Sequence, residues 1–408
     1  MSHSQEAVIR AAELIERQNR SAGQHALPVG VLTPLTLPGD PVAGELCVRG
    51  AVLGARYAAE HGLGPGVRLF LANDQVGADL EHMSRTAVGG LAKLAFIDRV
   101  SALIGQWHLR TTPSVAAMAE EIGLPTFVEN GHNTVNLGRR HLFRTYFSIA
   151  DRAPLMAGFI RERGWKRIAL VAADTVFGQM LADTLEQTLH KTVEGVEVLR
   201  IDFAQDGVSD LDAQLGEVAA FAPDLLLNAA VVRTNYMVIA SAVATGVLPG
   251  VPMMACFPFP MRSQDYWGLA GEAGAGVVWP ATRFSPDWPG LAPVGRWFVD
   301  RYESEFGSAP PDNALNAFTD VVVLAQAAAK AASTGRADLQ QALEEGTFET
   351  WRGPVSFRWT EETGHHDTPE IVLMHYRHTG DSAQDAVVVW PPESATGDYL
   401  DPSTGVTR

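Results

Sequence analysis

The chain has 408 residues, of which 46% are hydrophobic and 19% are charged, so it can bury more than one core and two domains are expected. Its 31 basic and 47 acidic residues give a net charge of -16, which argues against nucleic acid as a partner. No apolar run approaches the roughly 20 residues that a membrane-spanning helix needs, so we expect no membrane insertion.

The first 27 residues predict an amphipathic helical extension. Val8, Ala12 and Ile15 recur on one face at helical spacing. Charged residues interrupt every apolar stretch in this region, so a secretory signal peptide is not indicated. We expect a cytoplasmic protein if Met1 is the native start, and a periplasmic or extracellular protein if a leader was removed.

From residue 28 onward, predicted strands alternate with predicted helices. The first series has strands at 29–32, 67–71, 102–104 and 125–128, and helices at 44–61, through Arg85 and Ala92, and at 114–122. The second has strands at 168–171, 197–201, 225–229 and 253–256, and helices at 154–163, 179–190, 210–220 and 235–245. Repeated crossovers of this kind predict an α/β fold with doubly wound parallel sheets, whose loops open at one edge. Only the last strands, at 353–357 and 371–376, read as antiparallel.

This order of elements predicts two lobes. We expect lobe I to contain residues 28–145 and 280–353, and lobe II to contain residues 146–279 and 354–408, after the extension at residues 1–27. Since the chain then crosses between the lobes more than once, the connection is expected to form a multi-strand hinge.

Three segments carry a resemblance to a known family: "VGVLTPLTLPGDPVAGELCVRGAVLGARYAAEHG", "GWKRIALVAADTVFGQMLADTLEQTL" and "RGPVSFRW". They resemble the type I periplasmic binding proteins, which capture branched-chain amino acids, amides, urea and related small molecules. The segment "TGHHDTPEIVLMHYRHTG" is more similar to the amide- and urea-binding branch, which includes a cytoplasmic amide sensor. The resemblance implies two Rossmann-like lobes that close around a ligand.

The resemblance also implies where the ligand would be bound. The contacts carried over by position in lobe I are Trp107, His108, Leu109, Arg110, Thr111, Thr112, Gly131, His132 and Asn133. In lobe II they are Phe177, by analogy with a family tyrosine that lies over the ligand, Val231, Arg233 and Phe257.

Several of these positions depart from the family pattern. Leu109 and Asn133 stand where amino-acid binders have serine and threonine, and Phe257 stands where they present an acidic residue to the ligand ammonium. Because a buried ammonium without a carboxylate partner is costly, an ordinary α-amino acid is disfavoured.

Aromatic residues at predicted strand ends indicate a more apolar pocket wall, although each of them is as readily explained by core packing. They are Trp107, Phe177, Phe257, Phe259 and Trp279. The expected ligand is therefore apolar or aromatic and is either uncharged, for example an amide, or a carboxylate. Arg110, Arg233 and His132 are the candidate partners of a carboxylate, with solvated rim charges as the alternative explanation.

Metal and cofactor chemistry are not indicated. Cys47 and Cys256 are expected to be buried free thiols, and residues 365–367 (His-His-Asp) are expected to form a solvated turn and no metal site. No nucleophile elbow, phosphate-binding loop or zinc-protease motif is present in the sequence.

Three functions remain open at this point. The first is a non-enzymatic solute-binding protein, of the ABC-transporter type or a cytoplasmic derivative, that delivers its ligand to a membrane permease. The second is an amide-sensor-like regulator that signals to a protein partner. The third is a binding-protein fold recruited as an enzyme, in which His108 and His132 would act as acid and base.

Overall fold

The computed structural model describes residues 3–37, 39–74, 79–105, 108–204, 211–231, 233–258, 266–284, 288, 290–382, 385–403 and 406–407. The chain divides into two units, which we describe separately: unit 1 contains Met1–Phe147 and Pro286–Pro369, and unit 2 contains Ser148–Ser285 and Glu370–Arg408. Among the described residues, no helix is both long enough and apolar enough to cross a membrane.

Unit 1 is built on a seven-stranded sheet in the order β13-β14-β5-β4-β3-β1-β2. All neighbouring strands run parallel except β13 and β14. The strands are β1 (Leu27–Thr33), β2 (Val67–Asn73), β3 (Ala102–Gly105), β4 (Thr126–Phe127), β5 (Leu142–Arg144), β13 (Trp359–Thr360) and β14 (Gly364–His366). A separate hairpin is formed by β11 (Phe348–Thr350) and β12 (Gly353–Val355).

The helices of unit 1 bury the apolar faces of this sheet in two clusters. They are α1 (His3–Asn19), α2 (Pro41–Glu60), α3 (Leu80–Ala92), the π-helical turn η1 (Lys93–Ile97), α4 (Thr112–Glu121), α10 (Pro293–Phe306), α11 (Asp312–Lys330) and α12 (Arg336–Glu345). Asp40 caps α2 by accepting hydrogen bonds from the backbone amides of Val42 and Ala43.

Two glycines of α2 allow α11 to approach closely. A Cβ atom on Gly50 would lie 2.0 Å from the carbonyl oxygen of Ala314, and one on Gly54 would lie 2.8 Å from Cβ of Val321. Because these two glycines have no side chain, the backbone of α2 lies directly against α11 at both positions.

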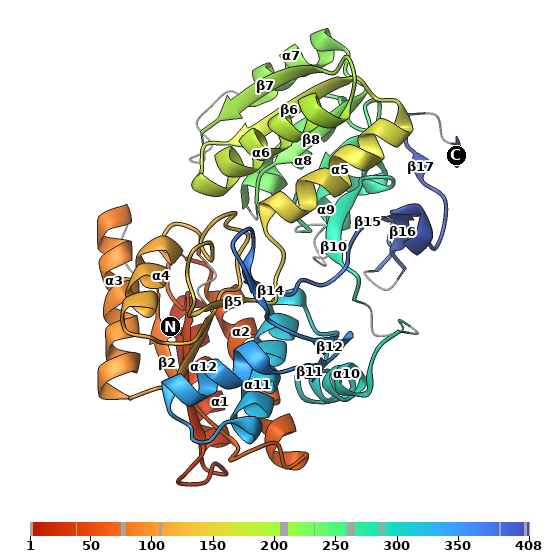
Figure 1. Ribbon diagram of the computed structural model, residues 1–408. Helices are drawn as coiled ribbons and strands as arrows, with labels where there is room; N and C mark the ends of the chain where they lie inside the picture. The colour runs from red at the N-terminus through yellow and green to blue at the C-terminus, as the bar shows by residue number, and fades with distance from the viewer. Residues whose placement is uncertain are drawn as a thin grey trace. The chain divides into compact units, whose positions relative to one another are not determined.

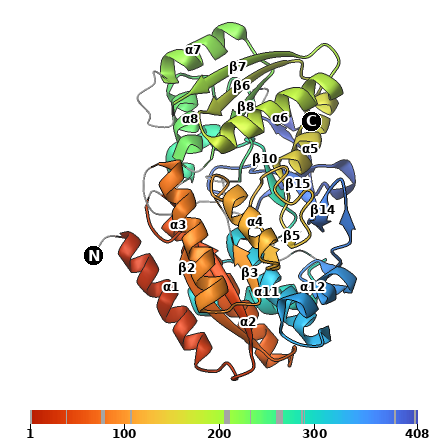
Figure 2. The ribbon, with the colours of Figure 1, turned by 60° about the vertical axis from the view of Figure 1, so that its left-hand side comes forward.

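The N-terminal extension belongs to unit 1. Helix α1 lies along β2, the edge strand of the sheet (Figure 2). The side chain of Asn19 makes two hydrogen bonds with the backbone of Leu69, donating at 2.8 Å and accepting at 2.9 Å. Arg10 pairs with Glu45 of α2 at 2.7 Å, so the middle and the carboxyl end of α1 are both attached to unit 1.

Unit 2 contains a four-stranded parallel sheet in the order β7-β6-β8-β9. Figure 1 shows β7, β6 and β8 next to one another, with α5 and α6 over one face. The strands are β6 (Arg167–Ala173), β7 (Glu197–Phe203), β8 (Leu225–Ala229) and β9 (Met253–Ala255). The helices are α5 (Ile149–Arg163), α6 (Val176–Thr192), α7 (Leu211–Phe221), α8 (Arg233–Ala244) and α9 (Tyr266–Ala270), followed by the 3-10 turn η2 (Gly271–Gly274).

An antiparallel sheet completes unit 2 in the order β10-β15-β16. Its strands are β10 (Trp279–Thr282), β15 (Ile371–His375) and β16 (Val387–Trp390), and the 3-10 turn η3 (Pro392–Ser394) and the hairpin of β17 (Leu400–Asp401) and β18 (Val406–Thr407) follow. The antiparallel character expected for residues 371–376 is confirmed.

The domain boundaries differ from those expected at two places. Residues 354–369, expected in lobe II, lie in unit 1, because β14 pairs in parallel with β5 and extends the large sheet. Residues 280–285, expected in lobe I, lie in unit 2, where β10 pairs with β15. The chain passes from one unit to the other three times.

The expectation for residues 365–367 is wrong in part. His365 belongs to β14, is fully buried and stacks on Phe143 with ring centroids 4.6 Å apart. Asp367 pairs with Arg352 at 2.8 Å and accepts a hydrogen bond from the amide of Ser356. These residues join a sheet edge to the hairpin, and they do not form a solvated turn.

Candidate functional site

In unit 1 the site predicted from the sequence lies at the carboxyl ends of β3 and β4. After β3 the chain turns into α4, and the carbonyl oxygen of His108 accepts hydrogen bonds from the amides of Thr111 and Thr112 at 3.1 and 3.2 Å. The hydroxyl of Thr112 also donates to this carbonyl at 2.8 Å. Trp107, the first residue of the predicted set, lies outside the described residues.

Asn130 joins the two predicted loops of unit 1. Its side-chain amide donates to the hydroxyl of Thr112 at 2.6 Å, and its carbonyl Oδ1 accepts from the backbone amide of His132 at 3.0 Å. Residues 108–112 and 131–133 are therefore brought together at this edge of the sheet. The hydroxyl of Thr112 serves this connection as both donor and acceptor, which makes it part of the loop scaffold.

Arg144, at the end of β5, supports the second loop from beneath. It is fully buried, and its guanidinium donates to the carbonyl oxygens of Asn130 and His132, the latter at 2.7 Å. The sequence alone does not indicate this role, because a charged side chain at a strand end is more often solvated than buried.

The two predicted histidines of unit 1 are held neutral. Burial, and then the charge of Arg110, lowers the pKa of His108 to about 4. Burial, and then the charges of Arg144 and Arg139, lowers the pKa of His132. Nδ1 of His108 is buried and has no hydrogen-bond partner within the described residues. At neutral pH both imidazoles therefore offer one donor and one acceptor, and neither is a cation.

A buried cluster of acidic residues lies directly behind these loops. Glu129 precedes Asn130, and its neighbours are Cys47 of α2, whose sulfur lies 3.9 Å from Oε2, and Asp320 of α11. All three side chains are buried. Burial, and then the charge of Asp320, raises the pKa of Glu129 well above its usual value, and burial raises the pKa of Asp320 to about 7. One proton shared by the two carboxyl groups removes the repulsion between them.

A third acid extends the cluster along the sheet edge. Asp74 follows β2 directly, its amide donates to the carbonyl of Thr33 at the end of β1, and burial raises its pKa to about 7. The carboxyl edge of unit 1 thus carries three buried acids whose pKa values are all raised by burial.

In unit 2 the predicted residues also lie at the carboxyl edge of a parallel sheet. Phe177 is in the first turn of α6, after β6, and Phe257 follows β9. Their rings contact each other edge to face, with centroids 5.8 Å apart, and both are half-buried. Val231 lies in the loop after β8, where its backbone amide donates a hydrogen bond to the hydroxyl of Thr234 at 3.1 Å. Arg233 begins α8, and its side chain lies outside the described part of the chain.

A fully buried cation lies next to the two rings of unit 2. Arg152, in the first turn of α5, donates from its guanidinium to the carbonyl oxygen of Cys256 at 2.9 Å. Its Cζ atom lies 5.7 Å from the ring centroid of Phe177. As for Arg144, the sequence does not indicate that Arg152 is buried, since position in a helix alone does not distinguish a buried arginine from an exposed one.

Trp279, considered for the pocket wall, is a core residue. It is fully buried in β10, and its ring lies 4.7 Å from that of Tyr376. Phe259 lies outside the described residues. Cys47 and Cys256 are both free and buried, which confirms the expectation for them.

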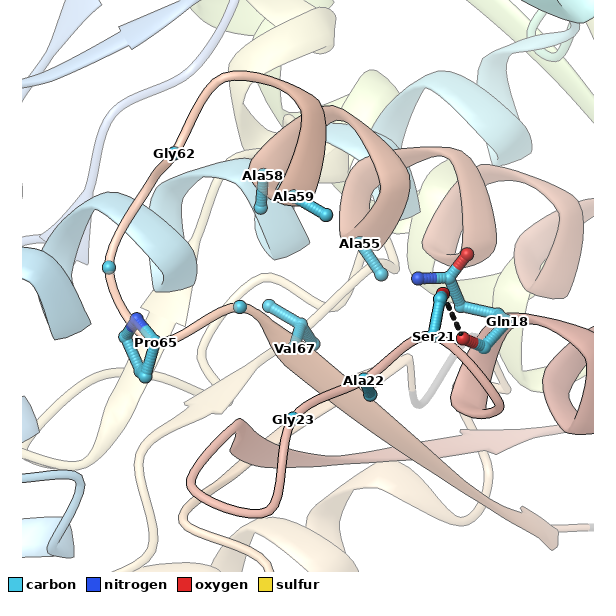
Figure 3. A pocket seen from close by; sticks show the side chains of 12 residues that line it. Gln18, Ser21, Ala22, Gly23, Ala55, Ala58, Ala59, Gly62, Pro65 and Val67 are labelled. Atoms are coloured by element: carbon cyan, nitrogen blue, oxygen red, sulfur yellow. Dashed lines mark hydrogen bonds between the residues drawn. The ribbon is translucent and has the colours of Figure 1, made fainter.

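A small pocket of about 220 Å³ lies elsewhere in unit 1, where α1 and α2 both end (Figure 3). Small side chains and loop backbone line it, among them Ala55, Ala58, Gly62 and Val67. Val67 is the first residue of β2, so the pocket lies at the amino-terminal edge of the sheet, opposite the predicted ligand loops. Within the described residues, no group of three or more His, Cys, Asp or Glu side chains is arranged to hold a metal ion.

Two α/β units, each with its candidate residues gathered at the carboxyl edge of a parallel sheet, define the class of two-domain ligand-binding proteins. A family model described as "Periplasmic binding protein" matches residues 26–380, and the chain belongs to that family. A search of curated proteins finds no match.

Solved structures support the fold. A leucine-binding protein from Thermotoga maritima is 18% identical, with a TM-score of 0.71 over 90% of this chain and 99% of the other. A solute-binding protein of an ABC transporter from R. palustris, in complex with benzoate, is 20% identical. Its TM-score is 0.71, and the match covers 89% of this chain and 95% of the other. Another solute-binding protein, from Rhodopseudomonas palustris BisB5 and in complex with 3,4-dihydroxybenzoic acid, is 18% identical. Its TM-score is 0.71, and the match covers 90% of this chain and 96% of the other.

Proposed function

We propose that this protein is a non-enzymatic solute-binding protein that captures a small organic molecule between its two units and delivers it to an import system. The family match supports binding as the role, and similar folds bind leucine, benzoate and a hydroxylated benzoate. On this proposal the loops 108–112 and 131–133 of unit 1 and the rings of Phe177 and Phe257 of unit 2 contact the ligand.

The observation that carries this proposal is the aromatic pair of unit 2. Phe177 and Phe257 present partly exposed rings at the sheet edge where ligands of parallel α/β proteins bind. Two adjoining rings supply apolar contact area and have no charge to offer an ammonium group. An apolar or aromatic molecule fits this wall better than a polar one.

Thermal unfolding with a panel of small molecules tests the proposal. The panel contains leucine, isoleucine, benzoate, 3,4-dihydroxybenzoate and the amides of these acids. A ligand present at a hundred times its dissociation constant stabilises the folded protein by about 2.7 kcal/mol, which is a shift of several degrees. A chain that is stabilised by no member of the panel would contradict the proposal.

The regulator and enzyme alternatives stay hypotheses, and no observation on the described residues favours either. The enzyme hypothesis depends on His108 and His132. If any turnover is found, the variant His132→Ala tests it, because unchanged turnover in that variant would remove the hypothesis.

A further inference from the structure

The pocket at the amino-terminal edge of unit 1 has a buried amide group in its wall. Gln18, in the last turn of α1, lines the pocket and is only 5% exposed. Within the described residues its side-chain amide makes no hydrogen bond, and Figure 3 shows this amide directed from α1 toward Ala55 of α2. Because a buried amide without a partner is unfavourable, we expect a molecule in the pocket to satisfy it.

The buried part of the wall is apolar. Ala55, Ala58 and Val67 form it, and they are fully or almost fully buried. At about 30 Å³ per water molecule, the volume of about 220 Å³ holds roughly seven waters. The pocket therefore has room for a small organic molecule that places a short apolar body next to the amide of Gln18.

Charge at the pocket argues for an uncharged ligand. None of the described residues that line it is charged. An anion would meet the carboxyl ends of α1 and α2, which carry negative partial charge. A cation would meet the guanidinium of Arg68, which lies 3.4 and 3.5 Å from the carbonyl oxygens of Ala22 and Gly23 in the wall. Either ion would lose its hydration without gaining a counter-ion.

The polar side chains of the wall determine which hydrogen bonds a ligand has to make. The amide of Gln18 offers a carbonyl acceptor and an NH2 donor. The hydroxyl of Ser21 donates its hydrogen to the backbone carbonyl of Gln18 at 2.8 Å, so it can only accept from a ligand. A matching ligand therefore has two N–H donors and one acceptor, which is the pattern of a primary carboxamide.

We propose that this pocket is a ligand site in its own right, which binds a small, uncharged primary carboxamide with a short aliphatic body. The NH2 group of the ligand donates to the side chains of Gln18 and Ser21, its oxygen accepts from Gln18, and its aliphatic body packs on the buried apolar wall. The site is separate from the predicted ligand loops, which lie at the carboxyl edge of the sheet. It does not depend on the proposed function.

An NMR titration with three compounds of the same size tests the inference. Propionamide carries the proposed group, butanone has a methyl group in place of the NH2, and propionate has a charged oxygen there. The methyl resonances of Ala55 and Val67 report binding in the pocket. We expect propionamide to shift them saturably, with a dissociation constant of about 1–10 mM because few atoms make contact. Butanone and propionate should bind at least about fivefold more weakly.

Two variants assign the response to the side chains of the pocket. Gln18→Leu keeps the approximate size of the side chain and removes both amide contacts, so it should lower the affinity for propionamide at least about tenfold. Ser21→Ala removes one acceptor and should lower this affinity about threefold. Gln341→Leu, the same replacement at an exposed position of α12, is the control and should leave the affinity unchanged.

Melting temperatures report whether the variants are folded. If Gln18→Leu does not fold, Ser21→Ala and the preference of the wild type for propionamide over butanone still decide. Phe177→Ala should leave binding in this pocket unchanged, because that residue belongs to unit 2.

Each outcome supports or overturns the inference. Saturable shifts with propionamide that weaken in Gln18→Leu support it. If no saturable shift is found at about ten times the expected dissociation constant, the pocket holds water only and the inference is overturned. Equal affinity for butanone, or equal affinity for propionamide in Gln18→Leu, overturns it as well. Failure to find any ligand for the loops and rings of the proposed site would contradict the proposed function and leave this site unaffected.

Discussion

Thr145 donates a hydrogen bond to Asp320, although the two residues lie 175 positions apart in the chain. The bond connects the segment after β5 to the middle of α11, and it places the carboxyl group of Asp320 within the electrostatic reach of Glu129. Three long-range elements of unit 1 thus meet directly behind the predicted ligand loops.

Asp320→Asn should stabilise the protein at alkaline pH. The folded pKa of about 7 lies above the unfolded value of 3.8, so the folded chain binds more protons between these pH values and stability falls as pH rises from about 4 to about 7. Asparagine removes this loss and still accepts the bond from Thr145. We expect the free energy of unfolding of the variant to exceed that of the wild type by on the order of 2 kcal/mol at pH 8 and to differ little at pH 4, as measured by denaturant unfolding.

Asp300→Asn, on the exposed side of α10, is the matched control and should change stability little at either pH. Equal effects of Asp320→Asn at pH 4 and pH 8 would contradict the assignment of a raised pKa to this carboxyl group.

His375→Phe should protect unit 2 against acid. Both ring nitrogens of His375 are buried, and burial, followed by the charge of Arg377, lowers its pKa to about 4. The unfolded chain takes up a proton near pH 6.5, so stability falls as pH drops from 6.5 towards 4. Between pH 6.5 and pH 4 the free energy of unfolding should therefore fall less in the variant than in the wild type, by on the order of 2 kcal/mol.

The control for this prediction is His378→Gln, because His378 is exposed and close in sequence. Melting curves at pH 4.5 and pH 8 make the measurement. An acid sensitivity that stays the same in His375→Phe would show that this histidine does not limit stability at low pH.

Phe177→Ala should weaken ligand capture and leave the fold intact. The ring lies in the first turn of α6 and contacts Phe257 and Arg152, and it is only half-buried. Loss of this contact area should reduce the affinity for the ligand about tenfold. Phe177→Tyr keeps the ring and should retain most of the wild-type affinity. Val176→Ala removes an exposed neighbour as the control. Equal affinity in Phe177→Ala would place the ring outside the site.

Asn19→Ala should loosen the N-terminal helix. The variant loses two hydrogen bonds to the backbone of Leu69, so its free energy of unfolding should be lower by about 1–3 kcal/mol. Hydrogen exchange at the amide of Leu69 should accelerate. Arg20→Ala, which breaks only an exposed pair with Glu16, should have almost no effect. An unchanged exchange rate at Leu69 would show that α1 is held by other contacts.

The repeated strands and helices of both units could be predicted, because buried parallel strands are local apolar runs and helices have their own spacing. The position of β14 could not, since it pairs with β5 far away in the chain and has no local signal for that register. The start of α5 was predicted at Pro154, whereas a capping box of Ser148 and Asp151 begins the helix earlier.

Within the candidate site, the loops could be predicted and their supports could not. His108 and Asn133 follow recognisable strand ends, and the family resemblance points to them. The side chains beneath the loops, Arg144 and Arg152, are charged residues that only three-dimensional packing buries. Their chemistry is visible in the sequence, but their surroundings are not.

The attachment of α1 along β2 has a consequence for how copies of this chain behave toward one another. An uncovered edge strand offers a row of free amides and carbonyls, onto which a strand of another molecule can add. By covering this margin of the sheet, the N-terminal helix protects the protein against edge-to-edge aggregation.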